Sequence, residues 1–210
     1  MPRLSEIASV NPVRKKICTN NVMIWKSVRE EISRLGKDAD LNHFDVSGIT
    51  NFYSLFTATG FCGDVSLWDV SKVYTMENMF AFTEFDGDLS LWDTRSLKMA
   101  NGMFKKSTFN SDITGWEVGK LKHMRMMFAY SPFNKDISQW QLVDPVDMSY
   151  MFYGSEISFC MDELAGRITK DTDVRCILDN TPDYKFRRDV FRKKVSKLKT
   201  IQNETVAITD

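Results

Sequence analysis

Large apolar side chains recur along the chain at a fixed interval of 24 residues, and a polar position keeps the same interval. One series consists of tryptophans, two of phenylalanines and one of aspartates. The series are Trp68, Trp92, Trp116, Trp140; Phe61, Phe85, Phe109, Phe133; Phe56, Phe80, Phe104, Phe128, Phe152; and Asp40, Asp64, Asp88, Asp112, Asp136. Four series at one period, without an insertion, predict a repeat protein.

The spacing within one unit predicts its local structure. A typical unit reads F-x-x-D-[VLI]-[ST]-x-W, with a Val, Leu or Pro five residues after the Trp, and then M-x-x-M-F; the first unit is degenerate, with Phe44 in place of the Trp. The segment Asp136 to Trp140 predicts a short strand of about five residues. Val73, Met76 and Phe80 are spaced i, i+3, i+7, which predicts one or two turns of α- or 3₁₀-helix. Stacking would pair the strands in parallel and turn each series into a column inside the core.

The repeats resemble those of a known family. The motif Phe133-Asn-Lys-Asp-Ile-Ser-Gln-Trp140, followed by Met148-Ser-Tyr-Met-Phe152, is similar to the repeats of BspA-type leucine-rich-repeat surface proteins. The resemblance covers roughly Asp40 to Phe152. It implies an α/β leucine-rich-repeat-like solenoid and, by family habit, binding to other proteins or to cell surfaces. It implies no catalytic residues.

Repeat stacks expose apolar ends, so helical caps are expected at both ends. We predict an N-terminal helical cap at 1–39, a leucine-rich-repeat solenoid of about five units at 40–160, and a C-terminal helical cap with a basic tail at 161–210. The first cap helix would begin near Asn20 or Asn21 and end at Gly36. Its apolar face is predicted to contain Val22, Trp25, Val28, Ile32 and Leu35.

Charge is balanced over the chain but not along it. Lys and Arg number 28, as do Asp and Glu, so the formal net charge is zero. The segment 185–199 nevertheless carries eight basic residues and one acidic residue. The basic residues are Lys185, Arg187, Arg188, Arg192, Lys193, Lys194, Lys197 and Lys199. Three interpretations stay open: a solvated amphipathic cap helix, a surface that docks an acidic protein, or contact with nucleic acid or an anionic membrane.

No residue pattern predicts catalysis, a cofactor or a metal centre. The four cysteines form no C-x-x-C pair and only His43 and His123 are present, so a zinc site of ordinary spacing is not expected. The aspartate series could share calcium ions. The alternative, which we favour, is that each Asp accepts a backbone N–H or the hydroxyl of the following Ser or Thr at a tight turn. We therefore expect no catalytic residues, no metal and no enzyme.

Positions that vary between copies are free to carry function, because the invariant positions build the core. The varying positions lie before each Trp, inside the predicted helical turn and just after M-x-x-M-F, and several hold aromatic or basic side chains, which are typical of interface hot spots. We predict a partner-binding stripe centred on Phe82, Tyr130 and Tyr153. The alternative is that these rings cover the edge of the protein's own core. The candidate residues are Phe82, Lys105, Lys106, Tyr130, Tyr153, Tyr74 and Tyr150.

The leading hypothesis is a non-enzymatic protein-protein interaction module that binds a partner protein. The alternative is a nucleic-acid-associated protein that uses the segment 185–199. No apolar run approaches the ~20 residues that span a bilayer, and no secretory signal is visible in Met1 to Val13. The expected location is therefore cytoplasmic, with export by a leaderless route or delivery as an effector as the alternative.

Overall fold

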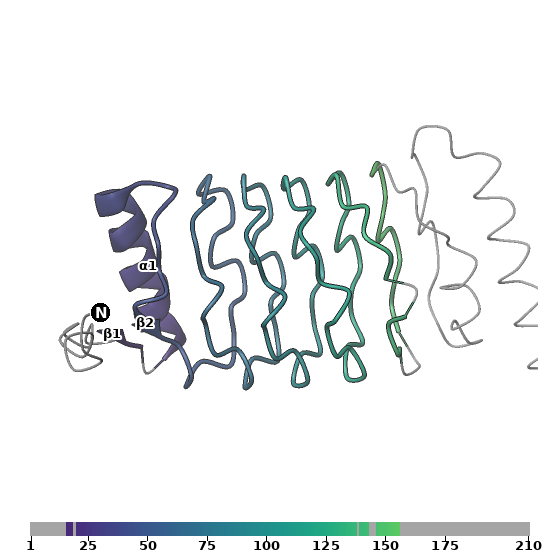
Figure 1. Ribbon diagram of the computed structural model, residues 1–210, viewed down its shortest axis with the longest axis horizontal. Coiled ribbons are helices and arrows are strands. Elements are labelled where there is room, and N and C mark those ends of the chain that lie inside the picture. The colour runs from purple at the N-terminus through teal and green to yellow at the C-terminus, as the bar shows by residue number, and fades with distance from the viewer. Residues whose placement is uncertain (1–15, 19, 138, 143–145, 156–210) are drawn as a thin grey trace, which may run out of the picture.

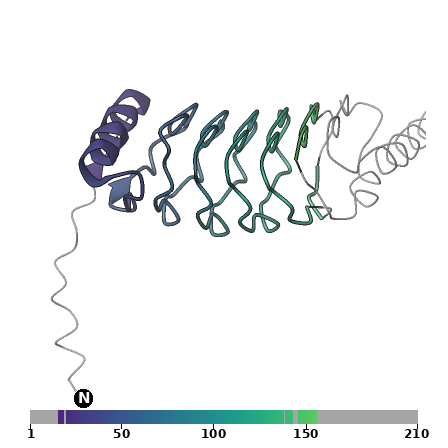
Figure 2. The same ribbon diagram turned by 90° about the horizontal axis from the view of Figure 1, so that it is seen from above.

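A computed structural model describes residues 16–18, 20–137, 139–142 and 146–155. Successive 24-residue turns of the chain, here called coils, lie side by side in a row (Figures 1 and 2). Helix α1, Asn21–Leu35, lies at one end of the row, next to the two-residue strands β1, Lys16–Ile17, and β2, Phe44–Asp45. The two strands are parallel, with Lys16 opposite Phe44. The expected C-terminal cap at 161–210 lies outside the described residues.

Helix α1 begins and ends where the sequence predicts. The side chain of Asn20 accepts a hydrogen bond from the backbone N–H of Met23 at 2.9 Å, which satisfies one of the free donors of the first turn. Gly36 ends the helix with φ of 103°, and its N–H bonds the carbonyl oxygen of Ile32 at 2.9 Å. The predicted helix between Asn20 and Gly36 is thereby confirmed.

The buried face of α1 differs from the predicted one. Ile24 and Val28 are fully buried, and Trp25 and Ile32 pack against the core while partly exposed. Val22, expected on the apolar face, is 79% exposed; Leu35 is exposed as well. The residues that pack against the coils, Ile24, Val28 and Ile32, are spaced i, i+4 and i+8. Val22 and Leu35 lie at the two ends of the predicted stripe, three residues from its next member, and both turn away from the coils.

Neighbouring coils are joined in parallel by backbone hydrogen bonds, as the sequence predicts. Alternate amides of one coil donate to carbonyl oxygens of the next. In one coil these pairs are Met76 to Met99, Asn78 to Asn101, Phe80 to Met103 and Phe82 to Lys105, each at 2.9 Å. Single parallel bridges recur at the residue before the first Met, as in Thr75 with Met99.

The short strand expected in the F-x-x-D-x-x-x-W segment is replaced by a turn. None of the described residues between Asp136 and Trp140 lies in a strand. In the preceding copies the aspartate accepts from the backbone N–H two residues on, at 2.8 Å for Asp88 with Ser90 and for Asp112 with Thr114. This local bond competes with an extended ladder. It confirms the turn interpretation of the aspartate series.

The helical turn expected around Met76 to Phe80 is also absent, and two consecutive tight turns take its place. In the first, the N–H of Met79 bonds the carbonyl oxygen of Met76 at 3.1 Å and Asn78 has φ of 54°. The next coil illustrates the second turn: the N–H of Ser107 bonds the carbonyl oxygen of Phe104 at 3.1 Å, and Lys106 has φ of 54°. A left-handed third residue is typical of type II turns and interrupts a right-handed helix.

Columns of aromatic rings fill the core. Phe80 and Phe104 stack at 5.7 Å between centroids and 2° between planes, and Phe85 and Phe109 stack at 6.2 Å and 2°. All four rings are fully buried. Over the described residues, which are largely non-helical, regularly spaced, stacked and buried Phe and Trp side chains make this a repeat structure.

Candidate interaction surface

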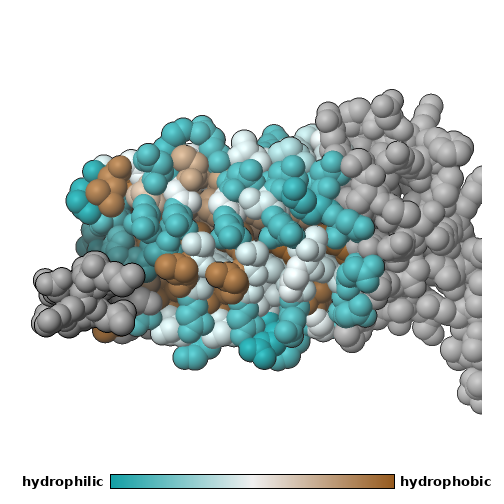
Figure 3. Space-filling model, viewed as in Figure 1, coloured by the Kyte–Doolittle hydropathy of each residue, from teal (hydrophilic) through white to brown (hydrophobic). Residues whose placement is uncertain are grey.

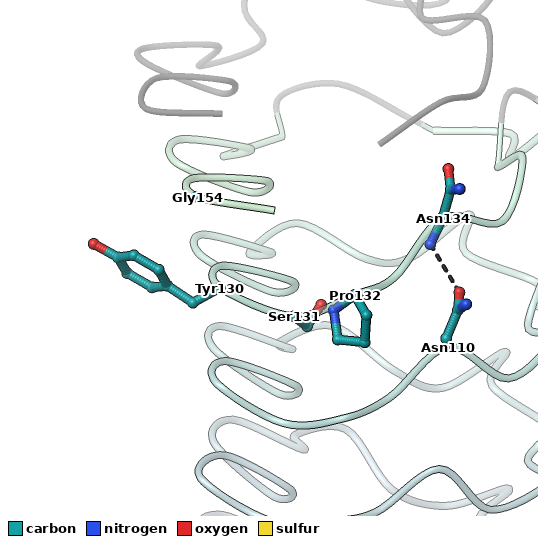
Figure 4. Close-up of a pocket in the computed structure, with 6 residues that line it drawn as sticks. All are labelled: Asn110, Tyr130, Ser131, Pro132, Asn134 and Gly154. Atoms are coloured by element: carbon teal, nitrogen blue, oxygen red, sulfur yellow. Dashed lines mark hydrogen bonds between the residues drawn. The ribbon is translucent and has the colours of Figure 1, made fainter. Parts of the chain in front are cut away.

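The second tight turn of each coil forms one edge of the row, here called the turn edge. Its third residue has a left-handed backbone in every copy, with φ between 54° and 69°. These residues are Ala58, Phe82, Lys106, Tyr130 and Gly154. Phe82 is 47% exposed and Tyr130 is 43% exposed. The backbone thus directs these side chains outward, and Figure 4 shows Tyr130 pointing away from the coils.

Three successive residues of the turn edge contact one another. The ammonium of Lys106 lies 5.4 Å from the ring centroid of Phe82 and 5.3 Å from that of Tyr130. Both distances allow cation–π attraction, which holds the flexible lysine between two rings of neighbouring coils. The three side chains therefore form a continuous strip across three coils.

The strip continues through two further tyrosines and an arginine. Tyr153 meets Tyr130 edge to face at 5.2 Å and lies 5.9 Å from Tyr150. The guanidinium of Arg125 lies 5.4 Å from the ring centroid of Tyr150. We call the whole set the aromatic–cation strip; it consists of Phe82, Lys106, Tyr130, Tyr153, Tyr150 and Arg125.

The structure brings together five of the seven side chains proposed from sequence. The other two are Lys105, which is half-buried in the same turn as Lys106, and Tyr74, which is exposed in another column of the repeat. In the described part of the chain, no ring contact joins Tyr74 to the strip. The sequence argument missed Arg125. Its column holds Glu77, Asn101, Arg125 and Ser149, and this variation in charge was the available signal.

A shallow pocket of about 410 Å³ adjoins the strip. Its lining residues are Asn110, Tyr130, Ser131, Pro132, Asn134 and Gly154 (Figure 4). The side-chain oxygen of Asn110 accepts the backbone N–H of Asn134 at 2.9 Å in its wall. The face of the row in Figure 3 is mostly hydrophilic, with hydrophobic side chains standing singly or in small groups.

The described residues give no sign of a metal centre or of a membrane-spanning helix. These residues contain no group of three or more His, Cys, Asp or Glu side chains placed to hold a metal ion. Within the same ranges, no helix has the length and apolar character to cross a membrane. The proposed basic patch, Lys185 to Lys197, lies outside the described residues and stays a prediction.

Comparison with known proteins identifies one family. A family model described as "Mycoplasma protein of unknown function, DUF285" matches residues 24–131 and 57–165. Two overlapping matches of one model are what a repeated sequence produces. No curated protein and no solved structure shows significant similarity to the chain.

Proposed function

The chain belongs to the DUF285 family, and on this premise we propose that it is a non-enzymatic protein-protein interaction module. In this proposal the coils form a rigid leucine-rich-repeat-like solenoid of the BspA type. A partner protein binds along the turn edge, through the aromatic–cation strip. The parallel bonding between coils and the resemblance of the repeats support the solenoid, since such arrays present extended binding surfaces.

One observation carries the proposal: large side chains occupy left-handed backbone positions on the turn edge. Such a position costs a non-glycine residue of order 1–3 kcal/mol, and glycine takes it without that cost, as at Gly154. Phe82, Lys106 and Tyr130 nevertheless hold it at φ of 58°, 54° and 58°. Backbone strain of this kind concentrates at functional sites. The exposed rings therefore favour a role outside the fold.

Replacing the strained residues with glycine separates the two interpretations of the strip. The double variant Phe82→Gly, Tyr130→Gly removes both rings and the backbone strain together. A partner would first be isolated from the native cell with the full chain and purified. We expect the variant to keep the thermal stability of the parent chain and to bind this partner at least about tenfold more weakly, because aromatic anchors dominate interface energies.

The double variant Leu67→Ala, Leu91→Ala is the matched control, because it removes two exposed apolar side chains from another column. It should bind normally. If the glycine variant loses stability, the rings serve to cover the protein's own core. If it binds the partner as tightly as the parent chain, the partner uses another surface.

A second candidate function is nucleic-acid binding through the segment 185–199, favoured by its eight basic residues. Neutralising phosphates with such a segment makes binding strongly dependent on salt. A gel shift of RNA or DNA that weakens with salt, and disappears when Lys193, Lys194 and Lys197 are replaced by Gln, would support this function. No shift at low salt would exclude it.

A further inference from the structure

The cations of the turn edge have no acidic partners. In the described residues, no carboxylate forms an ion pair with Lys105, Lys106 or Arg125, whereas other bases of the chain do pair, as Arg95 does with Asp93 at 2.7 Å. Lys106 and Arg125 lie over aromatic rings instead. An ammonium has three N–H donors, so Lys106 can bond an incoming acceptor while keeping its contacts with the rings.

The nearby acidic side chains are already engaged. The carboxylate of Glu77 accepts a hydrogen bond from the side-chain amide of Asn101 at 2.7 Å, and Glu84 pairs with Lys37. Among the described residues, no carboxylate is paired with a cation of the strip. Charge complementarity then calls for an acidic ligand at this edge.

The form of the strip favours a polypeptide over a nucleic acid. Single-stranded nucleic acids need open ring faces on which bases can stack. Lys106 lies over the rings of both Phe82 and Tyr130, and Tyr153 meets Tyr130 edge to face. The strip thus places a cation directly beside exposed rings, and a peptide that carries both carboxylates and apolar side chains matches this combination.

We infer that the turn edge binds an extended, acidic segment of a partner protein in which apolar and acidic side chains alternate along one face. This inference rests on the proposed function and names the chemistry of the partner. The Phe rings that stack between neighbouring coils in the core lie 5.3 to 6.2 Å apart. Two residues of an extended chain span about 6.8 Å, so every second side chain meets the next coil.

That spacing predicts the pattern apolar-x-acidic-x-apolar in the partner. The first apolar side chain would contact Phe82, the carboxylate would bond the ammonium of Lys106, and the second apolar side chain would contact Tyr130. Lys105 and Arg125 would attract further carboxylates on either side. An exposed ion pair of this kind adds specificity and association rate more than affinity.

The test is a titration of the full chain with a peptide whose two ends are blocked, Leu-Thr-Glu-Thr-Leu-Thr-Glu-Thr-Leu. The titration is monitored by the backbone amide signals in NMR spectra of the protein. The comparison peptide carries Lys in place of Glu. We expect the acidic peptide to shift the amides of Phe82, Lys106 and Tyr130, and the basic peptide not to. The variant Lys105→Gln, Lys106→Gln should weaken binding about three- to tenfold. The control is the double variant Lys72→Gln, Lys120→Gln, which removes the same charge from another column. It should leave the affinity for the peptide unchanged.

Each other outcome overturns the inference. Equal binding of the two peptides, or shifts confined to other residues, would exclude acidic recognition at this edge. Tighter binding of an oligouridine at the same amides would assign the strip to nucleic acid. Shifts at these amides that grow with protein concentration alone would assign it to a second copy of the chain. If the native partner depends on Phe82 and Tyr130 but the acidic peptide does not bind, the proposed function stands and this inference fails.

Discussion

The indole Nε1 of Trp92 donates a hydrogen bond to the carbonyl oxygen of Val65, one coil back, at 3.1 Å. The same bond recurs from Trp68 to Leu41 at 2.9 Å and from Trp116 to Leu89 at 3.0 Å. The Trp series therefore fills the core and also donates a second hydrogen bond to a carbonyl oxygen of the neighbouring coil, which already accepts a backbone N–H, as Val65 does from Trp68 at 3.2 Å. This double role explains why a tryptophan, rather than a phenylalanine, keeps the position.

Trp92→Phe should destabilise the protein although it keeps an aromatic ring. It removes the indole donor from the carbonyl oxygen of Val65, which keeps only the backbone N–H of Trp68 at 3.2 Å. Losing this hydrogen bond costs about 0.5–1.5 kcal/mol, and the smaller ring leaves a cavity that adds to the loss. Urea unfolding measures the difference in the free energy of unfolding. The neighbouring variant Leu91→Ala, at an exposed side chain, should change it by less than about 0.5 kcal/mol. Equal stability of Trp92→Phe and the parent chain would contradict a structural role for the bond.

Substitutions at the left-handed position of the first turn should have different effects in two copies. Gly102 has φ of 61°, and a Cβ there would lie 2.4 Å from Oδ1 of Asn78. Gly102→Ala should therefore lower the free energy of unfolding by more than about 1 kcal/mol. Met126 occupies the same position in the next coil with φ of 55°. Met126→Gly relieves the backbone strain but also gives the unfolded chain more conformational freedom, so the free energy of unfolding should change little.

Gly115→Ala is the control for this pair, because a Cβ at that position meets nothing within 4 Å. We expect it to be neutral or slightly stabilising, since alanine reduces the freedom of the unfolded chain. Thermal melts of the three variants compare them directly. A loss at Gly115 as large as that at Gly102 would mean that backbone conformation does not account for the difference.

Asp86, Asn110 and Asn134 occupy one position of the repeat and form a column of hydrogen bonds along the coils. Substitutions in this column should change the stability of the fold. Oδ1 of Asn110 accepts the N–H of Asn134 at 2.9 Å, and the N–H of Asn110 bonds Oδ1 of Asp86 at 2.7 Å. Asn110→Ala removes the acceptor and should cost about 0.5–1.5 kcal/mol. Asn110→Asp keeps an acceptor, as Asp86 does in the same column, and should cost less. Chemical denaturation would measure both, and a cost for Asp equal to that for Ala would contradict this account.

The period of the chain was predictable because every coil buries the same side chains. A column of stacked rings requires one residue type at one spacing. The recurrence of Phe80, Phe104 and Phe128 therefore predicts the core directly. The turns were harder to predict. The spacing of Val73, Met76 and Phe80 fits a helical face, but two tight turns of four residues give nearly the same spacing.

Glycine is the usual sign of a left-handed turn residue, and here it is mostly missing. Gly102 and Gly154 carry that sign, whereas Asn78, Phe82 and Tyr130 hold the same backbone with side chains. All residues of the strip except Arg125 were predicted from the sequence, because their positions vary between copies. Such variation indicates that a position is not needed for the core. The variation alone could not separate Tyr74 from the strip, since neighbours across coils depend on where the turns point.

The aspartate turns predict a loss of stability in acid. The backbone N–H of Ser90 holds the pKa of Asp88 below its ordinary value, and that of Thr114 does the same for the pKa of Asp112. A pKa that is lower in the folded chain than in the unfolded chain, where it is about 3.9, stabilises the fold above that pH. The contribution is lost as the pH falls through the folded pKa.

The double variant Asp88→Asn, Asp112→Asn tests this dependence. An asparagine oxygen can still accept the N–H two residues on, so the turns should persist at neutral pH. The variant should be somewhat less stable than the parent chain at pH 7, because it loses two charge-assisted hydrogen bonds. As the pH falls through the lowered pKa of these carboxylates in the folded chain, they become protonated, and the stabilities of the two proteins should converge. Urea midpoints between pH 7 and pH 2.5 measure this, and a constant difference over that range would show that the charge of these aspartates does not stabilise the turns.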